Sequence, residues 1–433
     1  MKRLTFFAAA LAVVVSLLAS EPVLISTQGS GRATAYLESP KIVTYQGKTH
    51  VAWLDSPSEG FRICIRTLDH GTNMWSGTYV VGEAQDNHGG PALIIDGDGY
   101  LHIIYYAHHD PVRYRKSLAP NDASQWTEYE GFGQNLTYPA LLCAKDGSLI
   151  LTARRSYDEK PWELEMWIKA PSENWQRQRS LIRSRHGIYA QFAASLAWGE
   201  DHETLHLGTR IYEVPADESR SPLTTVGYMT SKDGGKTWSR SDGSAIELPA
   251  TAETIDVLAS GRGIEGRILN AGSIAVGPNG LPYLPYGVRT EDSSESYLAT
   301  PYGDGKWRHR QLNKYLPELV RDWALFMHGG VSFGASGQPL VTAVAMRVKP
   351  LAPDWGDPTS ELVCFRSQDG GETFESRLLA EIDADVPSWM PNMERPTGFN
   401  EMPSYPSYLY TVGVRGDSLS DQLSNEVWWV PGE

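Results

Sequence analysis

Residues 87–117 read NHGGPALIIDGDGYLHIIYYAHHDPVRYRKS, and this stretch decides the fold. Two runs rich in β-branched and aromatic residues flank an Asp-Gly-Asp-Gly turn at 96–99, whose glycines supply the positive φ angles of a short hairpin. In a hairpin the start of the first strand lies beside the end of the second. We therefore expect His88 to share one end of a sheet with His108 or His109. Adjacent residues on a strand point to opposite faces, so we expect only one of that pair in a site.

Hairpins of this kind recur along the chain. Successive turns are roughly 50 to 75 residues apart, near the period of one propeller blade. A seventh unit could combine 404–412 and 427–430 with an N-terminal strand around 32–37. The pattern predicts an all-β, seven-bladed β-propeller with four-stranded antiparallel blades, as a single domain over 21–433; a β-sandwich array is the alternative. The six visible hairpin cores are 45–53, 96–108, 145–155, 200–210, 277–289 and 334–347.

Two further segments, 231–238 (SKDGGKTW) and 367–374 (SQDGGETF), fit the Asp-box pattern S-x-D-x-G-x-T-W/F. In such a box the Ser and Asp side chains bond the local backbone, a glycine takes a left-handed conformation and the aromatic ring packs between strands. Asp boxes are typical of propeller blades. We expect them to be structural and not catalytic.

The N-terminus predicts export. Residues 1–20 have a basic start, an apolar run and a small-residue cleavage site, which together are typical of a signal peptide. The apolar run is not followed by a stop-transfer pattern, and the cleavage site has no cysteine. We therefore expect a secreted or periplasmic monomer without a membrane anchor. Three scattered cysteines, Cys64, Cys143 and Cys364, favour buried thiols over a disulfide framework.

A net charge of −14 makes nucleic acid a poor partner. Candidate cations nevertheless end the second strand of the hairpins at nearly the same offset, and in a ring of blades such positions converge on one face. A cup of arginine and histidine suits an anionic polysaccharide, because a guanidinium can hold a carboxylate or sulfate with two hydrogen bonds. The candidate cations are His108, Arg154 or Arg155, Arg210, Arg289 and Arg347.

Tyrosines occupy a second recurrent place, before the first strand of a hairpin. Tyr138 and Tyr189 stand there in successive units, where His88 stands in the earlier unit. No Asp or Glu recurs at the cup positions, whereas glycoside hydrolysis generally uses two carboxylates. Histidine, tyrosine and arginine suit β-elimination from a uronic acid, which needs a base for the C5 proton, a cationic clamp for the carboxylate and a proton for the leaving oxygen.

A zinc site is a competing interpretation of the histidines, but the sequence offers no obvious third protein ligand near them. We therefore predict no catalytic metal. Propellers can hold one buried structural cation, calcium or zinc, for which no ligand set can be named.

At these residues the chain resembles the bacterial-neuraminidase-repeat propellers that include the ulvan lyases and the L-rhamnose-α-1,4-D-glucuronate lyases. The matching pieces are NHGGPAL…DGDGYLHIIYYAHH, TYPALL…DGSLILTARR, YAQFAASLAW…LHLGTR and SKDGGKTW, within 40–290. The resemblance implies a seven-bladed propeller that cleaves beside a uronic acid and leaves a 4,5-unsaturated uronate. The catalytic residues that it implies are His88, His108, Tyr138 and Arg154, with Arg210 and Tyr189 as substrate contacts.

The resulting hypothesis is a secreted lyase acting on ulvan-type rhamnose–uronate linkages. Tyr138 or His108 takes the C5 proton, Tyr138 protonates the leaving oxygen, and His88 and Arg154 hold the carboxylate. We add His109 and Arg289 as substrate contacts, and Tyr189 remains an alternative to Tyr138.

Two rival functions remain. A sialidase-like hydrolase would need a Phe-Arg-Ile-Pro motif, but the sequence at 61–63 continues into Cys64. A non-catalytic sugar-binding propeller would keep the arginines and aromatic residues without needing His88 or Tyr138.

Overall fold

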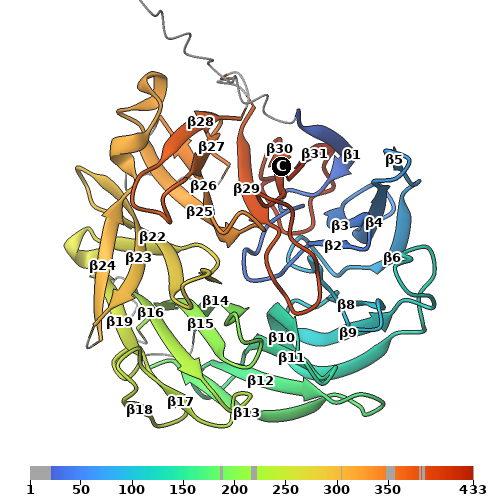
Figure 1. Ribbon diagram of the computed structural model, residues 1–433, viewed down its shortest axis with the longest axis horizontal. Coiled ribbons are helices and arrows are strands. Elements are labelled where there is room, and N and C mark those ends of the chain that lie inside the picture. Colours follow the sequence, from blue (N-terminus) through green and yellow to red (C-terminus); the bar gives the residue numbers. More distant parts are fainter. Residues whose placement is uncertain are drawn as a thin grey trace, which may run out of the picture.

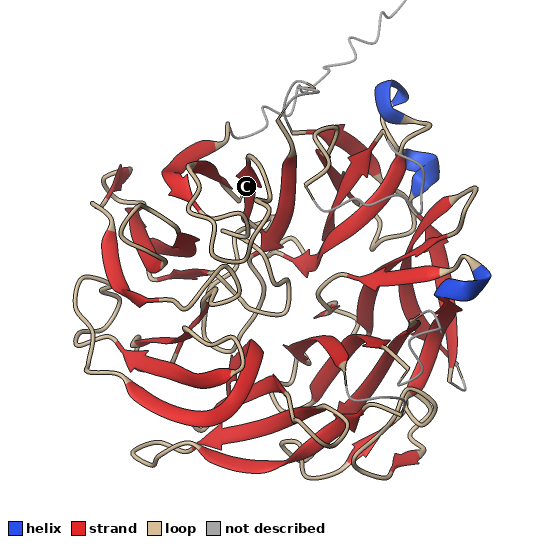
Figure 2. Cartoon of the chain, turned by 180° about the vertical axis from the view of Figure 1, so that it is seen from behind, coloured by secondary structure: helices blue, strands red, loops and turns tan. Residues whose placement is uncertain are grey.

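The computed structural model describes residues 21–185, 189–215, 222–303, 305–347, 356–379, 382 and 386–432. The signal peptide expected at 1–20 lies outside the described residues. Within them the chain is all-β, as predicted, and its strands form five antiparallel sheets. Three short 3-10 helices stand at the edge of the molecule in Figure 2, namely η1 (Gly263–Glu265), η2 (Asn313–Tyr315) and η3 (Glu318–Val320). No helix of the described residues has the length and apolar character needed to span a membrane.

The sheets follow one another around a common centre in chain order (Figure 1). The first sheet in this order contains both ends of the described chain, because β1 pairs with β31. Its nine strands are β1 (Val23–Gly29), β2 (Ile42–Tyr45), β3 (Lys48–Asp55), β4 (Arg62–Asp69), β5 (Met74–Trp75), β6 (Tyr79–Glu83), β29 (Ser388–Met393), β30 (Tyr408–Val412) and β31 (Asn425–Val430).

Two further sheets occupy the middle of the chain. The seven-stranded sheet contains β7 (Ala92–Ile95), β8 (Leu101–Tyr105), β9 (Asp110–Lys116), β10 (Glu130–Cys143), β11 (Leu149–Arg155), β12 (Glu163–Lys169) and β13 (Gln176–Arg183). The six-stranded sheet contains β14 (Ala190–Trp198), β15 (Leu205–Glu213), β16 (Leu223–Ser231), β17 (Trp238–Ser239), β18 (Ala245–Ile246) and β19 (Asp256–Arg262).

The last two sheets lie between the six-stranded sheet and β29 in Figure 1. The five-stranded sheet contains β20 (Ile268–Ala271), β21 (Ala275–Val276), β22 (Pro282–Arg289), β23 (Ser294–Tyr302) and β24 (Lys306–Gln311). The four-stranded sheet contains β25 (Ala324–Phe333), β26 (Pro339–Met346), β27 (Glu361–Arg366) and β28 (Glu375–Leu378).

All six predicted hairpins are present. Their strand pairs are β2/β3, β7/β8, β10/β11, β14/β15, β21/β22 and β25/β26. In the hairpin that decides the fold, Asp96 Oδ1 accepts hydrogen bonds from the backbone N–H groups of Asp98 and Tyr100, at 3.0 and 2.8 Å. Gly99 takes the positive φ of 84° that this turn requires.

The core lies between successive groups of strands around the centre, both between sheets and within the folded seven-stranded sheet. Strand β7 illustrates this arrangement, since its four residues are all buried and alternate between two clusters. Leu93 and Ile95 pack with residues of β3 and β4, whereas Ala92 and Ile94 pack with residues of β10 and β11. Alternation along a strand therefore sorts side chains between two cores, and leaves the strand ends near the centre to carry polar groups.

Both Asp boxes are the structural turns that the sequence predicts. Ser231 Oγ accepts the N–H of Gly235 at 2.8 Å, and Asp233 accepts the Thr237 hydroxyl at 2.6 Å. Ser367 and Asp369 make the same contacts with Gly371 and Thr373, at 2.8 and 2.6 Å. The predicted burial of the cysteines is also confirmed, because Cys64, Cys143 and Cys364 all lie in the core.

One prediction about the end of the chain is wrong. Residues 32–37 form no strand, and the N-terminal strand that pairs with β31 is β1. Residues 30–41 connect β1 to β2, and Arg32, Ala35, Tyr36, Leu37 and Glu38 line a cavity. Polar and apolar residues alternate along 32–37, so the pattern imitates a strand, whereas the segment is a connection that lines the cavity.

Candidate functional site

A cavity of about 700 Å³ gathers the residues that the sequence singled out. Its volume is typical of a small-molecule site. It is lined by ends of strands from several sheets and by the 30–41 connection. All eight predicted site residues line it, namely His88, His108, His109, Tyr138, Arg154, Tyr189, Arg210 and Arg289. Of the other predicted cations, Arg155 pairs with Glu165 and Arg347 is exposed beside Trp323, and neither lines the cavity.

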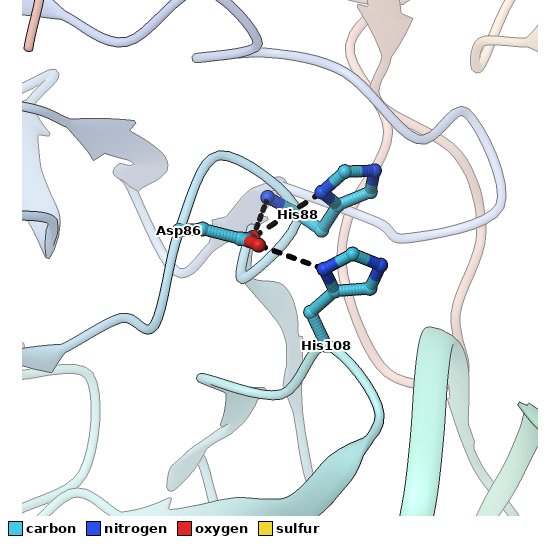
Figure 3. A group of neighbouring side chains, drawn as sticks. All are labelled: Asp86, His88 and His108. Atoms are coloured by element: carbon cyan, nitrogen blue, oxygen red, sulfur yellow. Dashed lines mark hydrogen bonds and ion pairs between the residues drawn. The ribbon is translucent and has the colours of Figure 1, made fainter. Parts of the chain in front are cut away.

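Asp86 holds the two predicted histidines together (Figure 3). Asp86 Oδ1 lies 3.2 Å from His88 Nδ1, and Asp86 Oδ2 lies 2.7 Å from His108 Nδ1. The two imidazole rings stack with centroids 3.8 Å apart and an interplanar angle of 16°. Sequence reasoning missed Asp86, although an aspartate two residues before a histidine in an Asp-Asn-His-Gly-Gly stretch is a signal for a side-chain-capped turn.

Local backbone geometry explains how the histidines meet. The N–H of His88 donates to Asp86 Oδ1 at 2.7 Å, which closes the turn before β7. A Cβ at Gly89 would lie 2.6 Å from the carbonyl oxygen of Tyr106, so only glycine allows the two segments to approach. Tyr106 and His109 adopt positive φ angles of 89° and 60° around His108. The chain after β8 therefore turns sharply and is not a continued strand.

The carboxylate fixes the tautomer of both rings through its contacts with their Nδ1 atoms. Burial opposes ionisation of Asp86, but hydrogen bonds from His108 and His88 outweigh it and hold the pKa of this carboxyl well below its usual range. Burial lowers the pKa of His88 to about 4, against the opposing hydrogen bond of Asp86, so His88 is neutral at pH 7. A neutral ring that donates Nδ1–H to a carboxylate presents the lone pair of Nε2 on its opposite side.

Arg32 and Tyr36 are site residues that sequence reasoning missed as functional groups. Arg32 Nη1 donates to the Tyr36 hydroxyl at 2.8 Å and also contacts His88 Nε2. The Tyr36 ring lies 4.9 Å from that of Tyr138, centroid to centroid. Among the described contacts, His108 Nε2 has no hydrogen bond. The lone pair of His88 Nε2 thus accepts from Arg32, and the lone pair of His108 Nε2 is available to a substrate.

The expectation that only one of His108 and His109 faces the cavity is wrong. Both line it, with ring centroids 4.5 Å apart, because His109 occupies a turn with positive φ and not a strand. Arg154 Nη2 donates to His109 Nε2 at 3.3 Å, and His109 Nδ1 donates to Ser156 Oγ at 2.6 Å. Burial, followed by the charge of Arg154, lowers the pKa of His109 to about 4.

Tyr138 projects from a bulge in β10. The register of β10 against β11 shifts between Thr137 and Ala140, and Tyr138 has a φ of 62°. Arg154 Cζ lies 4.4 Å from the centroid of the Tyr138 ring. Burial raises the pKa of the Tyr138 phenol, although Arg154 opposes that rise. The phenol therefore keeps its proton at neutral pH and can donate it.

Tyr189 and Arg210 stand together beside this group. Gln191 Nε2 donates to the Tyr189 hydroxyl at 2.6 Å, and Arg210 Nη2 donates to Gln191 Oε1 at 3.1 Å. The Tyr189 ring packs on Trp162 at 4.7 Å, and Trp162 also lies 4.8 Å from Arg154 Cζ. Tyr138, which lies against Arg154 and Tyr36, is closer to the paired histidines in this network than Tyr189.

Among the described residues, Glu38 is the one carboxylic acid that lines the cavity, and burial raises its pKa. The carboxylate of Asp86 is engaged by the two imidazoles. The arrangement therefore lacks the pair of facing carboxyl groups that glycoside hydrolysis generally uses. It provides a lone pair on imidazole, a phenol proton and several guanidinium groups, which is the set that elimination needs.

Asp86, His88 and His108 are also a potential metal-binding group, because their ligand atoms lie within 4.8 Å of one another. Sequence reasoning found no third ligand for zinc, and Asp86 corrects that point. Two imidazole nitrogens and a carboxylate are a donor set that zinc accepts. Here, however, the carboxylate accepts the N–H groups of both rings and the Arg32 guanidinium contacts His88. These hydrogen bonds give the Asp86 carboxylate and both Nδ1 atoms their partners without an ion. The reaction proposed below therefore uses side chains alone.

A family model described as a BNR repeat-containing family member matches residues 48–315, more than half of the chain. An ulvan lyase of Alteromonas sp. (strain LOR) is 23% identical over 261 residues, which cover 52% of this chain and 53% of that protein. The chain thus aligns with only about half the length of this relative.

Two solved structures resemble the whole described fold. One is an ulvan lyase of polysaccharide lyase family PL25, with a TM-score of 0.72 and 17% identity, covering 95% of this chain and 96% of the other. The second is such an ulvan lyase bound to -[GlcA(1-4)Rha3S]-, with a TM-score of 0.71, 17% identity and the same coverage. At this identity the likeness concerns the fold.

Proposed function

The chain belongs to the BNR repeat-containing family, and we propose that it is a polysaccharide lyase that cleaves ulvan-type polymers beside a uronic acid by β-elimination. The observation that carries this proposal is the convergence of the Asp86–His88–His108 group, Tyr138 and Arg154 on one cavity. The names of the relatives and the bound uronate–rhamnose oligosaccharide of one of them agree with it.

His108 is the base in this proposal. Its Nδ1–H is held by Asp86, and its Nε2 lone pair is not engaged by the described residues, so it can accept the C5 proton of the uronate. The electrons of the C5–H bond form the C4–C5 double bond as the C4–O bond breaks. Tyr138 donates its phenol proton to the leaving oxygen, since burial keeps that phenol protonated. The proton on His108 then passes to solvent and the phenol is reprotonated.

Arg154 holds the uronate carboxylate, whose negative charge grows as the C5 proton leaves. The sequence-based hypothesis gave His88 a share of this task. A neutral His88 that donates to Asp86 and accepts from Arg32 has no hydrogen left to donate. We therefore assign His88 a positioning role, in which it directs the Arg32 guanidinium toward the carboxylate beside Arg154.

The finer architecture belongs to the same proposal. The strands can be grouped into seven blades around the centre in Figure 1, of which the second has three strands. The pairing of β1 with β31 supports a blade built from both chain ends. The groups are β2-β3-β4-β6, β7-β8-β9, β10-β11-β12-β13, β14-β15-β16-β19, β20-β22-β23-β24, β25-β26-β27-β28 and β29-β30-β31-β1.

The protein is further proposed to be exported, on the signal-peptide pattern of residues 1–20, and to act as a monomer. Export would place it where an extracellular anionic polysaccharide is available. A sialidase-like hydrolase is less favoured, because Arg62 bonds Gln28 and does not line the cavity.

The test is incubation of the purified chain with ulvan while the ultraviolet absorbance of an unsaturated uronate is followed. A steady rise, absent in a His108→Ala variant, is expected. A silent result with ulvan and with every other uronic acid polymer would overturn the lyase function. Binding without absorbance would instead favour a non-catalytic carbohydrate-binding protein.

A further inference from the structure

A second group of polar residues lines the same cavity and has no part in the elimination. It consists of Asn270 on β20, Arg289 on β22 and His328 on β25, which we call the far wall. In Figure 1, β22 and β25 lie on the other side of the centre from β8 and β10. We call the group of Arg32, Tyr36, His88, His108, His109, Tyr138 and Arg154 the histidine wall.

His328 sits in a backbone position related to that of Tyr138. The register of β25 against β26 shifts between Phe326 and Gly330, so His328 lies within a bulge as Tyr138 does in β10. The sequence also repeats, since Gly-Gly follows His328 within β25 as Gly-Gly follows His88 before β7. A bulge in the first strand of a hairpin thus places a polar side chain in the cavity on both walls.

The far wall contains polar atoms without partners. His328 is buried, with 1% of its surface exposed, and its Nδ1 lies 3.0 Å from Asn270 Oδ1. Because that oxygen only accepts, His328 Nδ1 donates and Nε2 carries a lone pair. Neither His328 Nε2 nor Asn270 Nδ2 has a hydrogen-bond partner, and both atoms are buried. Buried polar groups are normally paired, so an acceptor and a donor side by side in a cavity indicate a ligand.

The charge and shape of the far wall identify the ligand class. Arg289 Cζ lies 3.8 Å from the centroid of Phe326, which holds the guanidinium against an aromatic face. Phe326, Met390 and Pro391 add apolar lining. Burial, followed by the charge of Arg210, lowers the pKa of Arg289 to about 10, and Arg289 remains a cation at neutral pH.

We propose that the far wall is a second sugar subsite, which binds the residue of the polymer next to the reacting uronate. A hydroxyl of that sugar donates to His328 Nε2 and accepts from Asn270 Nδ2, and an anionic substituent pairs with Arg289. The cavity volume of about 700 Å³ leaves room for this sugar beside the uronate. The inference rests on the proposed function, because it assumes that the uronate occupies the histidine wall.

The experiment compares the wild-type chain with His328→Gln, Asn270→Ala and Arg289→Gln on native and desulfated ulvan. Loss of a hydroxyl contact should raise KM about 10-fold in the first two variants and leave kcat within about 2-fold. His206→Gln is the control, since His206 is another buried histidine, bonded to Tyr228 and outside the cavity. Unchanged KM in both variants, or a fall in kcat alone, would overturn the subsite.

Arg289→Gln separates the two anions. If Arg289 reads a sulfate, the variant weakens action on native ulvan and removes the preference over desulfated ulvan. If it reads a carboxylate, the variant weakens action on both polymers equally. No effect on either polymer would remove Arg289 from the subsite.

A failure of the proposed function would be visible separately. If the wild-type chain produces no unsaturated uronate, titration calorimetry with the two ulvans replaces the kinetic assay. Weaker binding in Asn270→Ala and His328→Gln than in His206→Gln would still support the subsite. Equal binding in all of these proteins would overturn it.

Discussion

The two walls of the cavity use similar side chains in opposite ways. On the histidine wall, His88 and His108 are bonded to Asp86, and His109 is bonded to Ser156 and Arg154. On the far wall, His328 Nε2 and Asn270 Nδ2 are buried without partners. A group that must move a proton needs its tautomer fixed in advance, whereas a group that recognises a sugar can obtain its partner from the ligand. The difference indicates chemistry on one wall and binding on the other.

The largest expected effect is the loss of the two proton-transfer groups. We expect His108→Gln and Tyr138→Phe to lower kcat by about 10²–10⁴, since each removes a positioned acid or base. Steady-state kinetics on ulvan would measure it. The far-wall variants should instead act on KM.

His206→Gln serves as the control for both, as it alters a buried histidine outside the cavity. A kcat within about 3-fold of wild type in His108→Gln would contradict its role as base. Circular dichroism should give unchanged thermal midpoints, which separates loss of chemistry from loss of fold.

The next effect tests how the tautomers are fixed. Asp86→Asn is expected to lower kcat by about 100-fold, because the amide can donate to Nδ1 and so place the proton on Nε2, where the base needs its lone pair. The matched control is Asp96→Asn, which alters another aspartate–histidine pair, Asp96 with His102 at 2.9 Å, outside the cavity. Equal losses in the two variants would show that the effect of Asp86 is structural.

The sequence allowed the histidine wall to be predicted better than the far wall. The Asp-Gly hairpins mark strand ends, and strand ends near the centre carry the site, so His88, His108, Tyr138 and Arg154 could be found by their repeated positions. Asn270 gave no such signal. The Gly-Gly after His328 repeats that after His88, but it does not place His328 at the cavity, because a bulge in β25 does so and bulges are not visible in a hydrophobic pattern.

Arg32 and Tyr36 were missed for a different reason. Their segment was taken for a strand, whereas its path is fixed by the pairing of β1 with β31, which joins residues about 400 positions apart. Pairing at that separation cannot be read from local periodicity.

Acidification should reveal the neutral state of His88. Its folded pKa of about 4 lies below the ordinary value of 6.5, so the unfolded chain binds more protons between those two values. Stability therefore falls as the pH drops from about 6.5 to about 4, and this residue adds no pH dependence above that range. Between pH 7 and pH 5 the loss from His88 is about 2 kcal/mol as an upper estimate.

Urea unfolding at pH 7 and pH 5 would measure this loss. The free energy of unfolding should differ less between pH 7 and pH 5 in His88→Gln than in wild type. Asp96→Asn leaves His88 in place and should retain the contribution of His88 to that difference. An unchanged difference in His88→Gln would mean that His88 takes up its proton over the same pH range in the folded and the unfolded chain.

The smallest effect concerns the guanidinium that joins the 30–41 connection to the histidine wall. Arg32→Lys is expected to lower kcat about 10-fold with little change in KM, because an ammonium cannot bridge the Tyr36 hydroxyl and His88 Nε2 as the planar guanidinium does. The control is Arg62→Lys, on β4, whose guanidinium bonds Gln28 outside the cavity. If Arg32→Lys raised KM and left kcat unchanged, Arg32 would act in ground-state binding, as the far wall does. The division into a catalytic wall and a binding wall would then be wrong for this residue.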